Sequence, residues 1–233
     1  MLLSFNGRSQ QPEQYTYTHF KLTDGLASNI VSNLVQDRDG FIWLATNNGL
    51  QRFDGNKFTT FKSDPSQSSS LPSDEVTQVY CDRNKTIWVL TADNRVGIFD
   101  THTFQYREVP LQQWSKEKVS VEKTFIETTD GKLLLHFRKT NKLFQLASSG
   151  DAFVPSTAIP FPHNWNINHI IQDWRSQKFF MASDSGLVVY NPKTGNTGYH
   201  TTNPEREPLI SAFGGERFVN YLYIDAAQRF FFE

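Results

Sequence analysis

The feature that most constrains this chain is a short segment that occurs twice, 45 residues apart. The first copy, over residues 37–50, reads DRDGFIWLATNNGL, and the second, over residues 81–91, reads CDRNKTIWVLT. Recurrence at this distance is typical of a repeat protein, in which one unit is too small to bury its own apolar face. We therefore expect the units to stack on one another, so the fold follows from counting them.

The turn at the start of the segment recurs along the chain. Its first residues are Asp37, Asp82, Thr128, Asp173 and Asp225, at spacings of 45, 46, 45 and 52 residues. In the first unit, apolar runs over residues 30–36, 41–46, 50–53 and 57–61 alternate with three polar turns. Four strands joined by tight hairpins, at this period, are typical of one blade of a β-propeller.

The predicted fold class is therefore all-β, an incomplete β-propeller of about four and a half four-stranded antiparallel blades. We expect a flexible lead-in over residues 1–14 and a strand over residues 15–20 that resembles residues 58–61 and would close a final blade. The predicted blades span about 26–61, 71–106, 118–146, 166–200 and 213–233, the last truncated in its second strand.

Residues 25–31 (GLASNIV), 36–50 and 53–55 (FDG) together resemble the two-component regulator propeller repeat. The resemblance is close in the first two units, partial in the fourth and weak in the third and fifth. It implies a ring of seven blades that belongs to the periplasmic sensor of hybrid two-component histidine kinases. Such sensors occur mostly in glycan-degrading Gram-negative bacteria, where two rings precede a sandwich domain, a membrane helix and a kinase.

The resemblance thus implies a non-catalytic, ligand-sensing propeller fragment that is periplasmic and responds to glycans. Its expected partners are an oligosaccharide, the remaining blades and downstream signalling domains. Because an open row of blades leaves strand edges unpaired, we also expect self-association. Two alternatives remain: a glycan-active propeller enzyme (a lyase or sialidase-like) and a protein-interaction scaffold.

Composition excludes several other classes of function. The net charge of −1 favours neither nucleic acid nor an acidic membrane, and no apolar run is long enough to insert in a bilayer. One cysteine and six histidines without metal-ligand spacing predict no metal and no cofactor. Asp37–Gly40 resembles the start of a calcium loop, but the twelfth position holds Asn48 instead of Glu.

We assign structural roles to the residues that recur in the repeats. Trp43 and Trp88 are expected to pack against the neighbouring blade, and the hydroxyls of Thr46, Thr91 and Ser183 to bond to turn backbone. The predicted structural residues are Asp37, Gly40, Trp43, Thr46, Gly49, Asp82, Trp88, Thr91, Asp173 and Gly186.

Candidate ligand-binding residues lie in the loops that lead into each first strand, because these loops gather near the channel of a propeller. They are Asn29, Trp114, Asn164, Trp165 and Asn166. A tryptophan beside asparagine suits stacking on a sugar ring, although each tryptophan could instead cover a blade edge. An enzyme would require Arg, Tyr, His and Glu gathered on this face, and these loops are poor in them. Trp174 is expected to lie exposed on the opposite rim.

Overall fold

The computed structural model describes residues 17–113, 122–138, 140–213, 218–225 and 227–233. Its strands form four four-stranded antiparallel sheets and one two-stranded sheet, each a meander in chain order. The first blade contains β1 (Val31–Gln36), β2 (Ile42–Thr46), β3 (Gly49–Phe53) and β4 (Phe58–Phe61). The second contains β5 (Val76–Cys81), β6 (Ile87–Thr91), β7 (Val96–Phe99) and β8 (Tyr106–Glu108).

The remaining blades follow the same order. The third contains β9 (Lys123–Glu127), β10 (Leu133–Phe137), β11 (Lys142–Leu146) and β12 (Phe153–Pro155). The fourth contains β13 (Ile167–Gln172), β14 (Phe179–Ser183), β15 (Gly186–Asn191) and β16 (Asn196–Gly198). The fifth consists of β17 (Leu222–Ile224) and β18 (Phe230–Phe232), and the short helix α1 (Pro208–Phe213) precedes it.

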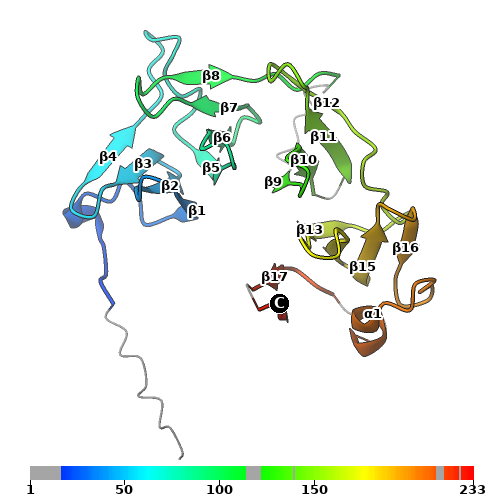
Figure 1. Cartoon of the computed structure of the whole chain (residues 1–233). Coiled ribbons are helices and arrows are strands. Elements are labelled where there is room, and N and C mark those ends of the chain that lie inside the picture. Colours follow the sequence, from blue (N-terminus) through cyan, green and yellow to red (C-terminus); the bar gives the residue numbers. More distant parts are fainter. Residues whose placement is uncertain (1–16, 114–121, 139, 214–217, 226) are drawn as a thin grey trace, which may run out of the picture.

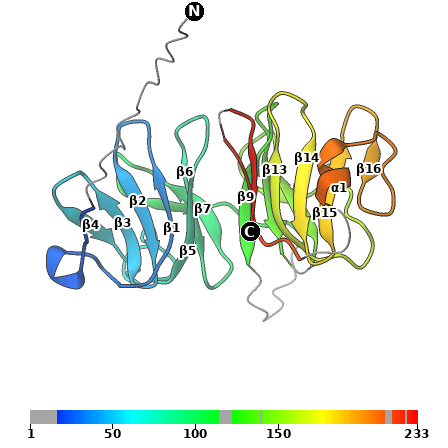
Figure 2. The same cartoon turned by 90° about the horizontal axis from the view of Figure 1, so that it is seen from below.

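The five sheets stand side by side in an open arc (Figure 1). The first strand of each blade, which we call the inner strand, faces the centre, and the fourth strand lies outside. Seen from the side in Figure 2, the strands of neighbouring blades run roughly parallel to the axis of the arc. The all-β, incomplete propeller expected from the sequence is therefore confirmed.

Each junction between blades is an apolar layer with a large side chain at its centre. Trp43 is fully buried, and its ring centroid lies 5.7 Å from that of Phe99 in the second blade. The ring centroids of Trp88 and of Phe153 in the third blade are 5.6 Å apart. We call this place on the second strand, paired with the inner-strand residue two before the first turn residue, the wedge position. Leu134, Phe180 and Phe231 occupy it in the last three blades.

One carboxylate fixes both the turn and the wedge in the first two blades. Asp37 accepts the amides of Asp39 and Phe41 through Oδ1, and the indole Nε1 of Trp43 through Oδ2 at 2.6 Å. Asp82 repeats this arrangement, and its Oδ2 accepts from Trp88 Nε1 at 2.9 Å. A buried indole N–H without an acceptor is costly, so the aspartate stabilises the buried tryptophan by accepting its N–H.

The second hairpin of a blade depends on a hydroxyl and a glycine. Thr46 Oγ1 donates to the carbonyl of Gly49 at 2.7 Å, and Ser183 Oγ donates to the carbonyl of Gly186 at 2.6 Å. Gly49 has φ of 120°, and a Cβ there would lie 2.6 Å from the carbonyl oxygen of Phe61. The position therefore requires glycine on both counts.

Three regions differ from the sequence-based expectations. The third blade continues past residue 146 into β12, because the buried Phe153 packs under Trp88 without any repeated motif to signal it. β8 begins at Tyr106, since Phe104 takes φ of 57° and belongs to the preceding turn. The longer fourth spacing contains α1, which the sequence pattern did not predict.

Residues 17–20, the described part of the expected closing strand, form no strand; Phe20 packs on Phe53 at 5.0 Å. Pairing of this segment with a further blade stays a prediction. Within the described ranges, no helix is long and apolar enough to span a membrane.

The two ends of the arc expose apolar side chains that are buried at the internal junctions. Leu34 on β1 is 59% exposed, whereas its counterpart Val79 is fully buried under the first blade. Phe231, at the wedge position of the fifth blade, is 49% exposed, whereas Trp43 is fully buried.

Candidate functional site: a cavity at the inner edge of the arc

A cavity of about 560 Å³ lies where the inner strands of all five blades begin. The side chains around it are mostly amides, hydroxyls and charged groups. They come from the starts of the inner strands and from the turns that follow the second strands: Ser32, Asn33, Thr77, Gln78, Thr91, Ala92, Asn94, Glu122, Lys123, Thr124, Arg138, Asn168, His169, Asn220 and Tyr221.

Bulges in the inner strands direct side chains into this cavity. The pairing of β1, β5 and β13 with their second strands skips one residue near the start, and the skipped residues are Ser32, Thr77 and Asn168. An extra residue in a strand bends it locally and re-aims its side chain, which is common beside binding sites. In the third blade, β9 pairs with β10 without interruption from Lys123 to Glu127.

Side chains next to the bulges link one blade to the next. Asn33 Oδ1 accepts the amide of Val79 at 3.0 Å, and at the equivalent place His169 Nδ1 accepts the amide of Leu222 at 3.4 Å. Gln78 occupies this position in the second blade. It lines the cavity, and its side-chain oxygen Oε1 is buried without a donor from the described residues.

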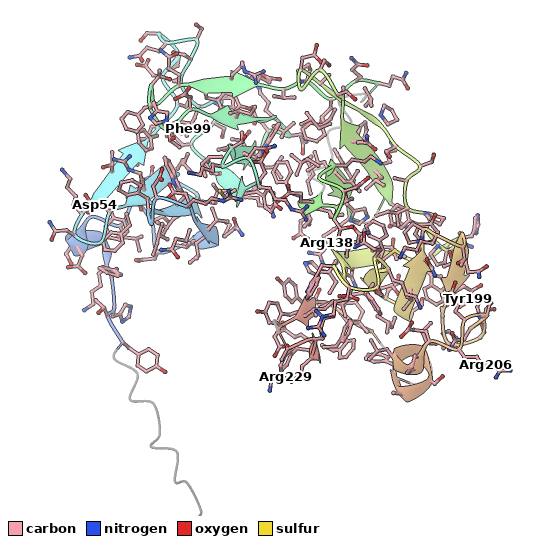
Figure 3. All side chains as sticks on the ribbon, viewed as in Figure 1. Asp54, Phe99, Arg138, Tyr199, Arg206 and Arg229 are labelled. Atoms are coloured by element: carbon pink, nitrogen blue, oxygen red, sulfur yellow. The ribbon has the colours of Figure 1, made fainter. Side chains whose placement is uncertain are left out.

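Two cations face the cavity from the third blade. Arg138 donates to Glu122 Oε2 at 2.5 Å and to Asn220 Oδ1 at 3.2 Å, so it reaches from the third blade to the fifth. Figure 3 shows Arg138 toward the inner side of the arc, whereas Asp54 and Tyr199 lie on its outer side. Lys123 donates to Asn94 Oδ1, and burial lowers the pKa of its ammonium to about 8.

An aromatic pair also lines the cavity. The rings of His169 and Tyr221 stack with centroids 4.0 Å apart, and Tyr221 is about half exposed. Burial, aided by the charge of Arg138, lowers the pKa of His169 to about 4, so the imidazole is neutral near pH 7. A neutral stacked ring beside amide and guanidinium donors is suited to binding a ring that carries hydroxyls.

The predicted ligand-binding residues lie elsewhere. Trp165 is half-buried, stacks on His200 at 5.7 Å and packs against Tyr199 at 5.0 Å. Asn166 donates to Asp184 Oδ2 at 2.7 Å, and Asn29 and Asn164 are exposed. These four do not line the cavity, and Trp114 lies outside the described residues. Their role in ligand binding stays a prediction.

The sequence-based reasoning missed Lys123, Arg138, His169 and Tyr221, because it searched loops and these residues belong to strands or their ends. Strand pairing places Lys123 where the other blades have Val31, Val76 and Ile167. In the sequence it lies five residues before the turn residue instead of six, so the repeat alone did not mark it. The cluster of Arg, His, Tyr and Glu that a propeller enzyme would require is therefore present at the cavity. Trp174, as expected, is exposed (60%), at the far end of β13.

Within the described ranges, no group of three or more His, Cys, Asp and Glu side chains is arranged to hold a metal ion. Two of the charged cavity groups, Arg138 and Glu122, instead form an ion pair.

Comparison with known proteins matches residues 25–48 and 70–93 to the family model described as "Two component regulator propeller". Histidine kinase P4 of Formosa agariphila is 33% identical over 61 residues, which are 26% of this chain and 4% of that protein. The chain thus spans a small fraction of the curated relative that it matches.

Among solved structures, the extracellular domain of a putative hybrid two component system from B. thetaiotaomicron superimposes with a TM-score of 0.63 at 19% identity. The match covers 96% of this chain and 27% of that one. A streptogramin B lyase matches with a TM-score of 0.57 at 13% identity, over 87% of this chain and 61% of the lyase. At these identities the likeness establishes the propeller fold.

For the first two blades, the family model specifies the type of repeat and not the fold alone. The matched segments contain the Asp–Trp pairs described above. These blades are therefore two-component regulator propeller repeats, as their sequence predicted.

Proposed function

We propose that this chain is the ligand-sensing propeller part of a two-component sensor, that it acts in the periplasm, and that it binds a glycan without catalysis. The observation that carries the proposal is the cavity, where amide and hydroxyl groups from five blades surround the His169–Tyr221 ring pair. Such a surface can hydrogen-bond several hydroxyls while an aromatic face covers the sugar ring.

Sensing requires that the ligand favour one arrangement of the blades over another. The cavity meets this requirement because its wall consists of contacts between blades, such as Arg138 with Asn220 and His169 with Leu222. A ligand that bonds to Gln78 on one side and Tyr221 on the other would stabilise the second and fifth blades at one separation. We propose that this restraint is the signal passed to the downstream domains.

The second candidate function is a glycan-active enzyme, favoured by the cluster of Glu122, Arg138, His169 and Tyr221 at the cavity. Two observations favour binding alone. His169 Nδ1 accepts a backbone amide, and the hydroxyls of Thr77 and Thr91 donate to a carbonyl and a carboxylate, not to the histidine. These threonines therefore form no nucleophile–base pair with it.

The experiment is a screen of the purified chain against an array of oligosaccharides, followed by calorimetric titration of the hits. We expect Tyr221→Ala and Gln78→Leu each to weaken binding about tenfold or more, as expected for the loss of a ring contact or a buried hydrogen bond. Trp174→Ala, at the opposite end of β13, is the matched aromatic control and should leave affinity unchanged.

Loss of binding in Trp174→Ala with none in Tyr221→Ala would contradict the cavity as the site. Formation of unsaturated or shortened sugars by the wild-type chain, abolished in His169→Ala, would support the enzyme instead.

We also propose that the two exposed ends of the arc associate with other blades, whether those of a longer chain or of a second copy. Leu34 and Phe231 occupy the receiving and wedge positions of a junction, so the ends are complementary. Sedimentation of the 233-residue chain should show oligomers that Leu34→Glu disperses. A monomer at high concentration would contradict self-association.

A further inference from the structure

The third blade departs from the repeat where it meets the cavity. In the first, second and fourth blades, the first residue of the inner strand pairs with a hydroxyl residue that ends the second strand. These pairs are Val31 with Thr46, Val76 with Thr91, and Ile167 with Ser183. The third blade has Lys123 paired with Phe137 instead, and the ammonium lies 5.2 Å from the centre of the phenyl ring.

Arg138, the residue after Phe137, departs from the repeat as well. The amide of Arg138 donates to the carbonyl of Glu122, as the amide of Ala92 donates to Glu75 and that of Asp184 to Asn166. Arg138 therefore occupies a place where the second and fourth blades have a small residue and an acidic one. Lys123 and Arg138 are thus cations at positions where the other blades have neutral or acidic residues, and both line the cavity.

A half-buried lysine at a position that accepts valine or isoleucine is costly to the fold, because burial disfavours its charge. The fold holds its ammonium on Asn94 Oδ1 and beside the Phe137 ring, and Lys123 and Asn94 both line the cavity. We infer that the cavity binds an anionic group of a hydroxyl-rich ligand, a carboxylate or sulfate on a sugar, between the ammonium of Lys123 and the guanidinium of Arg138. The inference rests on the proposed function and specifies its ligand.

The charges around this place are compatible with an anion. Arg138 already binds one carboxylate, that of the exposed Glu122, so the geometry of its guanidinium suits a carboxylate. Asp93, whose charge acts on Lys123, is bound by Arg95 at 3.0 Å and by the hydroxyl of Thr91. We expect the ligand carboxylate to take the place of Glu122 on Arg138, and a ligand hydroxyl to reach Gln78 Oε1.

The test uses an array with matched acidic and neutral oligosaccharides, such as galacturonate and galactose trimers, and inorganic sulfate as a separate titrant. We expect the acidic member of a pair to bind at least about tenfold more tightly, as charge-assisted bonds to two cations should provide. Lys123→Met and Arg138→Gln should each weaken binding of the acidic member about tenfold more than binding of the neutral member, and so remove most of that preference. Lys193→Met, at an exposed turn residue, is the matched lysine control.

A second readout is pH. Because the pKa of Lys123 is about 8, acidic ligands should lose affinity between pH 7 and pH 9, and Lys123→Met should abolish this loss. Equal affinity for acidic and neutral members in the wild type would overturn the inference and leave the proposed function standing. Sulfate as tight as the acidic sugar would overturn the sugar as ligand. If neither the acidic nor the neutral oligosaccharides bind, the proposed function itself is contradicted.

Discussion

The second and third blades have the same four-stranded meander, yet they hold it together differently. In the second blade, Asp82 binds two turn amides and the indole of Trp88. In the third, Thr128 and Leu134 occupy these two positions, and the threonine hydroxyl accepts the amide of Lys132 at 2.9 Å and donates to Asp130 Oδ1. Leu134 is nevertheless fully buried. Loss of the sequence motif therefore marks a change of side-chain chemistry and leaves the blade intact.

The comparison also shows where new chemistry enters. The second blade presents Val76, Thr91 and Ala92 at the inner edge, whereas the third presents Lys123, Phe137 and Arg138. The regular blade has apolar and small residues there, and the irregular one has cations. Departure from the repeat is thus the informative signal at the cavity.

The largest expected effect on stability comes from the residues at the wedge position of the two blades, Trp88 and Leu134. Trp88→Ala should lower the free energy of unfolding by about 4–5 kcal/mol, because it leaves a large cavity and removes the partner of Asp82. Leu134→Ala should cost about 2–4 kcal/mol, since only methyl and methylene contacts are lost. Urea unfolding of both variants measures the difference, and a larger loss for Leu134→Ala would contradict the role of the Asp–Trp pair.

Replacing the first turn residue should also cost more stability in the second blade than in the third. Asp82→Ala should cost about 2–4 kcal/mol, because two amides and a buried indole lose their acceptor. Thr128→Ala should cost about 1 kcal/mol, since one amide loses a neutral acceptor. Thermal melting of the two variants tests this, and equal shifts would show that the carboxylate acts on the turn alone.

The third and fourth blades should also be acid-sensitive. Burial lowers the pKa of His136 and of His169 from 6.5 to about 4. Below pH 6.5 the unfolded chain therefore binds protons that the folded chain does not, and stability falls as the pH approaches 4. Each histidine contributes a slope of at most about 1.4 kcal/mol per pH unit.

The matched variant for this pH dependence comes from the second blade, where Leu90 stands at the position of His136. Asn141 hydrogen-bonds the imidazole of His136, whose Nε2 is buried without a partner among the described residues. Because Leu does not titrate, His136→Leu should flatten the slope. Unfolding measured from pH 4 to pH 7 provides the test. An unchanged slope would exclude His136 as a source of the acid sensitivity.

The smallest expected effect restores the repeat at the cavity. Lys123→Val, which copies Val76, should stabilise the chain by about 1 kcal/mol, because it removes a half-buried charge. The same variant should lose the preference for acidic ligands. A destabilised Lys123→Val chain would indicate that the lysine has a structural role.

The blades could be predicted from the sequence because their signals are local. The spacing of Asp37 and Asp82, the glycine that follows and the alternating apolar runs all depend on neighbours within a few residues. β12 was missed because Phe153 is recognised only by the side chains that pack on it, chiefly Trp88.

The cavity could not be predicted in this way, because curvature of the arc brings together residues more than 40 positions apart. Arg138 and Asn220 are 82 residues apart in sequence and 3.2 Å apart in the fold. No local pattern contains that distance. The loop residues selected from the sequence were chosen by composition, and Trp165 proved to be half covered by Tyr199 and His200.

The bond between the turn aspartate and the wedge tryptophan also restricts the order in which a repeat can diverge. If the tryptophan changes first, the aspartate still accepts turn amides, as Asp173 does beside the buried Phe180 and Asp225 does beside Phe231. If the aspartate changes first, a buried indole N–H loses its acceptor. Losing the aspartate first is therefore the more costly route, and the five blades of this chain hold only Asp–Trp, Asp–Phe and Thr–Leu pairs.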